Sequence, residues 1–140
     1  MPHLTYFSGN DPYVSDTGIG VIMDSAYRAI KTVSPGNGRV TGDSHEFSVI
    51  NGGKTALITI FQPTPYDLSR YGLPVSGIQP WGWVGDRIFQ EIEIETGKVL
   101  FEWRALDHIM LEQSYYDRGS SGHDPSDPWD FVYVSSKSYL

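Results

Sequence analysis

The sequence contains no cysteine, no run of basic residues and no long apolar stretch. The missing cysteine excludes disulfides and thiolate metal sites. The ten basic residues are scattered among 17 acidic ones, and the formal net charge is −7. This charge argues against a nucleic-acid surface, which needs clustered Lys and Arg. A membrane helix needs roughly 18 apolar residues. We therefore expect neither nucleic acid nor a membrane as a partner.

Helical periodicity is weak along the chain, and residues 1–13 lack the basic and apolar regions of a signal peptide. As written, the chain is expected to stay where it is made, and its native compartment stays open. Aromatic and turn residues are abundant, with four Trp, nine Tyr, six Phe, 15 Gly and nine Pro in 140 residues. This composition favours a packed all-β core, because aromatic rings bury large areas. We expect a single domain over residues 1–140.

Two hairpin signals define the centre of the chain. Alternating runs flank Glu95-Thr96-Gly97-Lys98, and a second pair of runs flanks Asn51-Gly52-Gly53-Lys54. A hairpin alone is marginally stable in water, so both belong to a larger sheet. The predicted strands are Glu46–Ile50, Thr55–Gln62, Ile88–Ile94 and Lys98–Arg104, with an ordered loop over Pro63–Gly85. Four consecutive antiparallel strands form one propeller blade or half of a barrel.

Further strands are predicted on both sides of this unit. They are Leu4–Ser8, Ile19–Asp24 and Ala29–Val33 upstream and Phe131–Ser135 downstream, with a short helix over Ser25–Thr32 as an alternative. Groups of three, four and one strands result when a repetitive blade array is cut out of phase. We therefore expect an all-β partial β-propeller of about two blades' worth of strands, with its complete blade at about 43–105. A small stand-alone β-sandwich or barrel is the alternative fold.

A series of short motifs occurs in a fixed order along the chain. They are Asp43-Ser44-His45-Glu46-Phe47, Thr55-Ala56-Leu57, Gly82-Trp83-Val84, Phe89-Gln90-Glu91-Ile92, Glu95-Thr96-Gly97, Val99-Leu100-Phe101-Glu102-Trp103, Leu106-Asp107-His108 and Pro128-Trp129-Asp130. Leu4-Thr5-Tyr6-Phe7-Ser8-Gly9 and Met23-Asp24-Ser25-Ala26-Tyr27 fit the same pattern upstream. The ordered set resembles the fungal branch of the arylsulfotransferase family and covers most of the chain, from Leu4 to Asp130.

The resemblance implies a β-propeller that transfers a sulfuryl group from an aryl sulfate to a phenol, with no nucleotide sulfate donor and no cofactor. In bacterial members a histidine near the propeller axis is transiently sulfated, and other His, Asn and Arg side chains hold the sulfate oxygens. Neutral imidazole is a competent nucleophile near neutral pH. Fuller members are often secreted. The resemblance thus implies aryl sulfates and phenols as small-molecule partners.

The chain departs from the family pattern after the Pro-Trp-Asp motif. Family members place a His-x-Asn motif there, whereas Tyr133 and Ser135 stand at those positions in this sequence. We take Tyr133 and Ser135 as candidate substrate-binding residues. The chain ends before the later blades of the family pattern, so we expect a partial copy of doubtful activity.

His45 and His108 are the candidate catalytic residues. His45 matches the family's His-Glu-Phe motif at the start of a predicted inner strand, between Asp43 and Glu46. A surface histidine with local hydrogen bonds is the alternative. His108 follows Asp107, and a carboxylate can orient an imidazole. Adjacent residues of an extended chain point to opposite sides, however, so Asp107 need not be the carboxylate that orients His108. A packed Asp-His pair in a loop is the alternative.

Other candidate groups have simpler explanations. His123 lies among Asp117, Asp124 and Asp127, but the spacing fits no calcium loop, and a solvated loop is favoured. Glu91, Glu93 and Glu95 share one face of a half-solvated strand. Core packing explains the aromatic residues Trp81, Trp83, Phe101, Trp103 and Trp129 better than a phenol-stacking wall. No metal site is expected.

Two functional hypotheses stay open from the sequence. The first is an arylsulfotransferase-like enzyme, and the second is a non-catalytic propeller fragment that acts as a binding or interaction module. The non-catalytic fragment is favoured for the isolated chain, because Tyr133 and Ser135 replace the family's His-x-Asn residues and the later blades are absent. An open fragment exposes blade faces, so we also expect self-association or poor folding.

Overall fold

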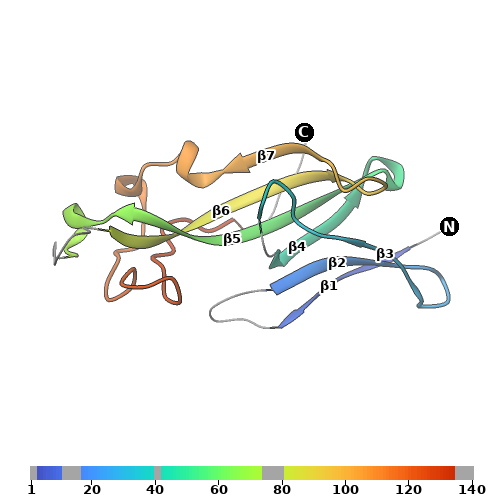
Figure 1. Cartoon of the computed structure of the whole chain (residues 1–140), viewed down its shortest axis with the longest axis horizontal. Coiled ribbons are helices and arrows are strands. Elements are labelled where there is room, and N and C mark those ends of the chain that lie inside the picture. Colours follow the sequence, from blue (N-terminus) through green and yellow to red (C-terminus); the bar gives the residue numbers. More distant parts are fainter. Residues whose placement is uncertain (1–2, 11–16, 40–41, 74–80, 135–140) are drawn as a thin grey trace.

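The computed structural model describes residues 3–10, 17–39, 42–73 and 81–134. Two antiparallel sheets, ordered β1-β2-β3 and β4-β5-β6-β7, make up its regular structure (Figure 1). The strands are β1 (Leu4–Asn10), β2 (Thr17–Met23), β3 (Ala29–Val33), β4 (Asp43–Ile50), β5 (Thr55–Asp67), β6 (Trp81–Glu93) and β7 (Val99–Arg104). Four 3-10 turns complete the elements: η1 (Asn51–Gly53), η2 (Ser69–Tyr71), η3 (Ala105–Asp107) and η4 (Leu111–Gln113).

The all-β prediction is confirmed. The two sheets form no closed barrel, which is consistent with a partial propeller. The four-stranded sheet runs from Asp43 to Arg104, a range close to the one expected for the complete blade, about 43–105. That blade boundary and the single domain over residues 1–140 stay predictions. Among the described residues, no helix is long and apolar enough to cross a membrane.

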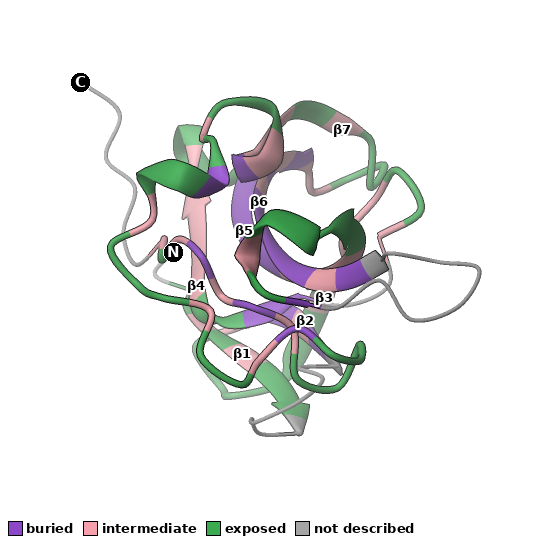
Figure 2. Ribbon diagram, turned by 90° about the vertical axis from the view of Figure 1, so that its left-hand side faces the viewer, coloured by how far each residue is buried: buried purple, intermediate pink, exposed green. Residues whose placement is uncertain are grey.

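The two sheets pack face to face. We call the face of β4–β7 that meets β1–β3 the inner face and its opposite the outer face. Ile22 and Val33 of the smaller sheet pack against Ala56, Ile58 and Ile92 on the inner face. Period-2 alternation along β5 and β6 places every second residue on this face. Buried residues concentrate on β5 and β6, and the consecutive run from Thr55 to Ile60 is buried on both faces of β5 (Figure 2).

The predicted loop over Pro63–Gly85 is partly wrong, because β5 and β6 continue pairing as far as Asp67 and Trp81. Pro63 and Pro65 lie opposite Gly85 and Trp83. The N–H groups of Trp83 and Gly85 donate away from β5, to the carbonyls of Gly122 and Trp129. These cross-strand pairs are therefore non-hydrogen-bonded, and a proline opposite them costs no ladder bond.

Two further local predictions need correction. A helix does not form over Ser25–Thr32, because the Asp24 carboxylate accepts the N–H groups of Ala26 and Arg28 in a tight turn before β3. The predicted strand Phe131–Ser135 is absent over residues 131–134, and Ser135 lies outside the described residues. β7 pairs with Ile88–Ile92 of β6, so the C-terminal segment contacts β6 further along, through a Val84–Trp129 bridge.

A second apolar cluster covers the extended ends of β5 and β6. It contains Leu68, Leu73, Val84, Ala105, Leu111, Trp129 and Phe131. The segment 105–134 thus folds back over this end of the sheet, as the orange and red trace shows (Figure 1). The same fold-back carries Asp130 and Tyr133 toward the start of β4, which positions the site described below.

A buried polar network connects the β3–β4 link to the inner face. Gln90, which is fully buried, bonds both the N–H and the carbonyl of Gly36 and donates to Glu102. Arg39 holds the Glu102 carboxylate with its Nη2 2.8 Å from Oε1. The hydrogen bond from Arg39 is the main reason that the pKa of Glu102 lies below its usual 4.5, while burial opposes the shift.

This lowered pKa predicts an acid-sensitive contribution to stability. Because the folded-state pKa lies below the unfolded value, the contact stabilises the fold fully above pH 4.5, and the stabilisation disappears as pH falls through the folded-state value. The melting temperature of the wild type should therefore fall more steeply on acidification than that of Glu102→Gln. Thermal unfolding curves across this pH range measure the difference, and parallel curves would contradict the assignment.

Exposed apolar side chains lie on both outer surfaces of the sheet pair. Phe101 is 47% exposed at the edge of the larger sheet, and Leu4, Tyr6 and Ile30 are exposed on the smaller one. The self-association expected from the sequence stays a prediction. Sedimentation should show concentration-dependent oligomers, and a compact monomer at all concentrations would contradict it.

Candidate functional site

The first residues of β4 place His45 beside a buried carboxylate. Nδ1 of His45 lies 2.6 Å from Oδ1 of Asp43, whose side chain is only 3% exposed, whereas the imidazole is 37% exposed. A pairing irregularity between Asp43 and Phe47 interrupts the β4–β5 register at this point. Such irregularities re-aim side chains, and here both members of the pair reach one another although they lie two residues apart.

Arg87 of β6 connects this pair to the C-terminal segment. Its Nη1 donates to Oδ2 of Asp43 at 2.9 Å, and its Nε donates to Oδ1 of Asp130 at 3.1 Å. A further bond joins Nη2 to Oδ2 of Asp130, so this pair is bidentate. The guanidinium also lies over the Phe61 ring, 4.2 Å from its centroid. One buried cation therefore fixes two carboxylates from distant parts of the sequence.

Tyr133 completes the cluster. Its ring meets His45 edge-on, with the ring centroids 5.1 Å apart and an interplanar angle of 90°. The Arg87 guanidinium lies 5.3 Å from the Tyr133 ring centroid. The structure thus brings together His45 and Tyr133, two residues that the sequence indicated separately. The Ser135 prediction lies outside the described residues.

His108 lies elsewhere on the same face. Its ring stacks on Trp103, with centroids 5.2 Å apart and an interplanar angle of 6°. Trp103 stacks in turn on Phe89, which alternation places on the outer face together with Arg87. No described ion pair joins His108 to Asp107, whose carboxylate lies 3.7 Å from Nη1 of Arg104. The two histidines therefore share the outer face without direct contact.

Sequence reasoning missed Arg87 altogether. Its partners Asp43 and Asp130 lie 44 and 43 residues away, so no local pattern reveals them. Asp130 appeared only as part of the Pro-Trp-Asp motif. The available signal was the pair Asp86-Arg87 between the apolar residues Val84 and Ile88 of one strand, since a buried charge needs partners.

The chemistry of the cluster follows from the Asp43–His45 pair. A carboxylate on Nδ1 selects the tautomer in which Nδ1 carries the hydrogen and Nε2 carries the lone pair. Nε2 is then available as a nucleophile or base. No group of three or more potential metal ligands occurs among the described residues.

A family model described as arylsulfotransferase (ASST) matches residues 4–139. This chain belongs to the arylsulfotransferase family. The resemblance noted in the sequence is thereby confirmed over nearly the whole chain. Searches of curated proteins and of solved structures found no match. Within this arylsulfotransferase-family chain, His45 and Tyr133 therefore stand as site candidates on the geometry given above.

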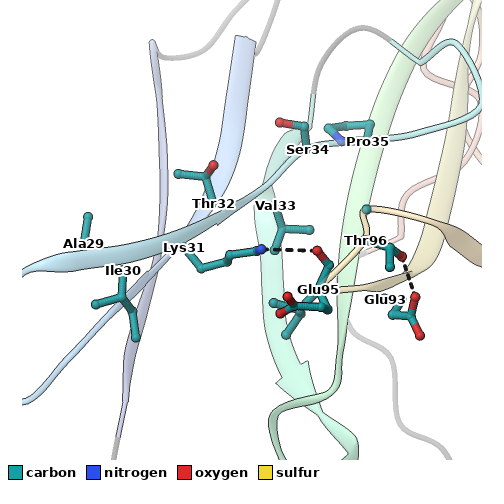
Figure 3. A pocket seen from close by; sticks show the side chains of 12 residues that line it. Ala29, Ile30, Lys31, Thr32, Val33, Ser34, Pro35, Glu93, Glu95 and Thr96 are labelled. Atoms are coloured by element: carbon teal, nitrogen blue, oxygen red, sulfur yellow. Dashed lines mark hydrogen bonds between the residues drawn. The ribbon is translucent and has the colours of Figure 1, made fainter.

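A separate hollow of about 660 Å³ lies between β3 and the β6–β7 turn. Lys31 reaches across it to the carbonyl oxygen of Glu95, and Thr96 bonds Glu93 at its far side (Figure 3). Neither candidate histidine lines it. This hollow is therefore distinct from the His45 cluster.

Proposed function

We propose that this chain transfers a sulfuryl group from an aryl sulfate to a phenol, with His45 as the residue that accepts the group. The observation that carries the proposal is the buried Asp43 carboxylate 2.6 Å from Nδ1 of a half-exposed imidazole. Family membership supports the substrate class. The arrangement of nucleophile and orienting carboxylate is the one that nucleophilic catalysis requires.

The first step forms a bond between Nε2 of His45 and sulfur and breaks the bond between sulfur and the aryl oxygen. The phenolate leaves with the electron pair of the broken bond. The N-sulfated imidazole ring carries a positive charge, which the Asp43 carboxylate stabilises through its hydrogen bond to Nδ1–H. The Asp43 carboxylate acts by charge and orientation and takes up no proton.

The second step returns His45 to its starting state. The oxygen of the acceptor phenol attacks sulfur, the N–S bond breaks, and the electron pair returns to Nε2. The acceptor's phenolic proton goes to the departed phenolate, directly or through water. The products are therefore the aryl sulfate of the acceptor and the free phenol of the donor. Tyr133 packs against the His45 ring and presents an aromatic surface to the aryl group.

His108 belongs in this proposal as part of an aromatic surface on the outer face. Its stacking on Trp103 holds the imidazole flat, which suits contact with an aryl ring. On the basis of this stacking we assign His108 to contact with the substrate, in addition to the catalytic role that the sequence suggested.

Non-catalytic binding of aryl ligands is the second candidate function. The observation that favours it is the pairing of Arg87 with two carboxylates, Asp43 and Asp130. A guanidinium so engaged offers less charge to sulfate oxygens than an unpaired one. Tyr133 also replaces the histidine of the family motif at this place.

A chromogenic assay separates the two candidates. The purified chain is incubated with 4-nitrophenyl sulfate and a phenol acceptor, beside His45→Ala, His108→Ala and the loop variant His123→Ala as a matched control. Turnover should disappear in His45→Ala, show a raised KM in His108→Ala and stay unchanged in His123→Ala. Wild-type binding of the aryl sulfate without turnover would refute the transferase proposal in favour of the binding module.

A further inference from the structure

A second hollow, of about 350 Å³, lies beside the apolar cluster at the extended end of β5 and β6. Tyr71, Trp129, Glu112 and Arg118 are among its lining residues. Its volume falls within the range of small-molecule sites. Trp129 belongs to the second apolar cluster, whereas Asp130, the next residue, reaches Arg87 on the outer face. None of the described residues of the His45 cluster lines this hollow.

Two aromatic rings form a fixed wall of the hollow. The rings of Tyr71 and Trp129 lie 5.0 Å apart between centroids at an interplanar angle of 56°. Trp129 is 4% exposed, and its indole N–H donates to the carbonyl of Tyr116 at 3.2 Å. The contact with the buried Trp129 ring orders the Tyr71 ring, so a planar ligand would meet an aromatic surface that is already fixed, which lowers the cost of binding.

Two polar side chains that line the hollow, Arg118 and Glu112, can each form a further hydrogen bond. Arg118 donates from Nε to the Tyr71 carbonyl at 2.7 Å and from Nη1 to the Ser121 carbonyl. Within the described part of the chain, neither a carboxylate nor another acceptor engages its Nη2. Burial raises the pKa of the Tyr71 hydroxyl, and a hydrogen bond to Glu112 raises it further. A carboxylate has two oxygens and about four acceptor positions, so Glu112 can accept a second donor.

We propose that this hollow binds a neutral phenol. The hydroxyl of a phenol accepts a hydrogen bond from Nη2 of Arg118 and donates one to Glu112, while its ring packs on Tyr71. Among the described residues that line the hollow, Glu112 and Asp117 supply two negative charges and Arg118 one positive charge, so an anionic aryl sulfate is disfavoured. The inference does not depend on transfer at His45.

Isothermal titration of the purified chain with 4-methylphenol and with 4-methylphenyl sulfate tests the proposal. The same titrations use His45→Ala, Arg118→Gln and Glu112→Ala. Arg28→Gln, a change at an exposed arginine outside the hollow, serves as the matched control. Glu112 is exposed, so its variant tests the site even if Arg118→Gln fails to fold.

We expect saturable binding of the phenol that is equal in the wild type, His45→Ala and Arg28→Gln. Arg118→Gln and Glu112→Ala should each weaken it by about tenfold, the effect of one lost charge-assisted hydrogen bond. The sulfate ester should bind at least about tenfold more weakly than the phenol. Three results would overturn the proposal. They are equal binding of the ester and the phenol, unchanged affinity for the phenol in both Arg118→Gln and Glu112→Ala, and loss of phenol binding in His45→Ala. The last of these results would place the phenol at His45.

Discussion

Replacing Arg87 with leucine is expected to lower the free energy of unfolding by about 3–5 kcal/mol. The guanidinium is 8% exposed and pairs with Asp43, which is 3% exposed, and with Asp130. Removal of the cation leaves the Asp43 carboxylate buried, with the neutral His45 ring in place of a cation beside it. An uncompensated buried charge is costly because it has lost its hydration. Urea denaturation of the two proteins measures this difference.

Arg28→Leu provides the control for this prediction. Arg28 also pairs with an aspartate, Asp24, but its side chain is 78% exposed. Exposed pairs contribute little because water screens them, so the loss here should stay below about 1 kcal/mol. Equal losses for both variants would mean that the Arg87 pairs contribute no more than a surface contact.

The second large effect is expected from Asp43→Asn. Nη1 of Arg87 donates to one side-chain oxygen of residue 43, which orients an asparagine with its carbonyl toward Arg87 and its NH₂ toward His45. The amide then donates to Nδ1, and the hydrogen of the neutral ring moves to Nε2. Sulfuryl transfer should fall by about a thousandfold or more, because Nε2 no longer carries the lone pair.

Steady-state assays at saturating aryl sulfate measure this loss, with Glu95→Gln as a control carboxylate that is exposed and distant from the cluster. The Asp43→Asn protein should keep its fold, since the amide retains an acceptor for Arg87. Turnover close to that of the wild type in a folded Asp43→Asn protein would rule out the orienting role of Asp43.

Much of the fold could be predicted from local turn chemistry. Asn51, Gly52 and Gly97 have positive φ angles at the two hairpin turns, and these residue types signalled both hairpins in the sequence. The extension of β5 through Pro63 and Pro65 could not be predicted in the same way. It depends on the bonds of the opposite strand to Gly122 and Trp129, which lie far away in the sequence.

The candidate site was predictable only in part for a similar reason. His45 and Tyr133 stood out by resemblance to a family pattern, but their contact depends on the fold-back of the segment 105–134 over β5 and β6. Arg87 fixes this arrangement through partners 43 and 44 residues away. Pairings at such separations are set by tertiary packing and leave no local periodicity.

The most direct test of the transfer role of His45 is the mass of the protein after incubation with 4-nitrophenyl sulfate in the absence of any acceptor. If His45 accepts the sulfuryl group, the protein gains an adduct of one SO₃ group that fragmentation locates on His45. A phenol acceptor should remove this adduct, and His45→Ala should lack it. An adduct on another residue, or a protein that binds the aryl sulfate and never gains the group, would contradict it.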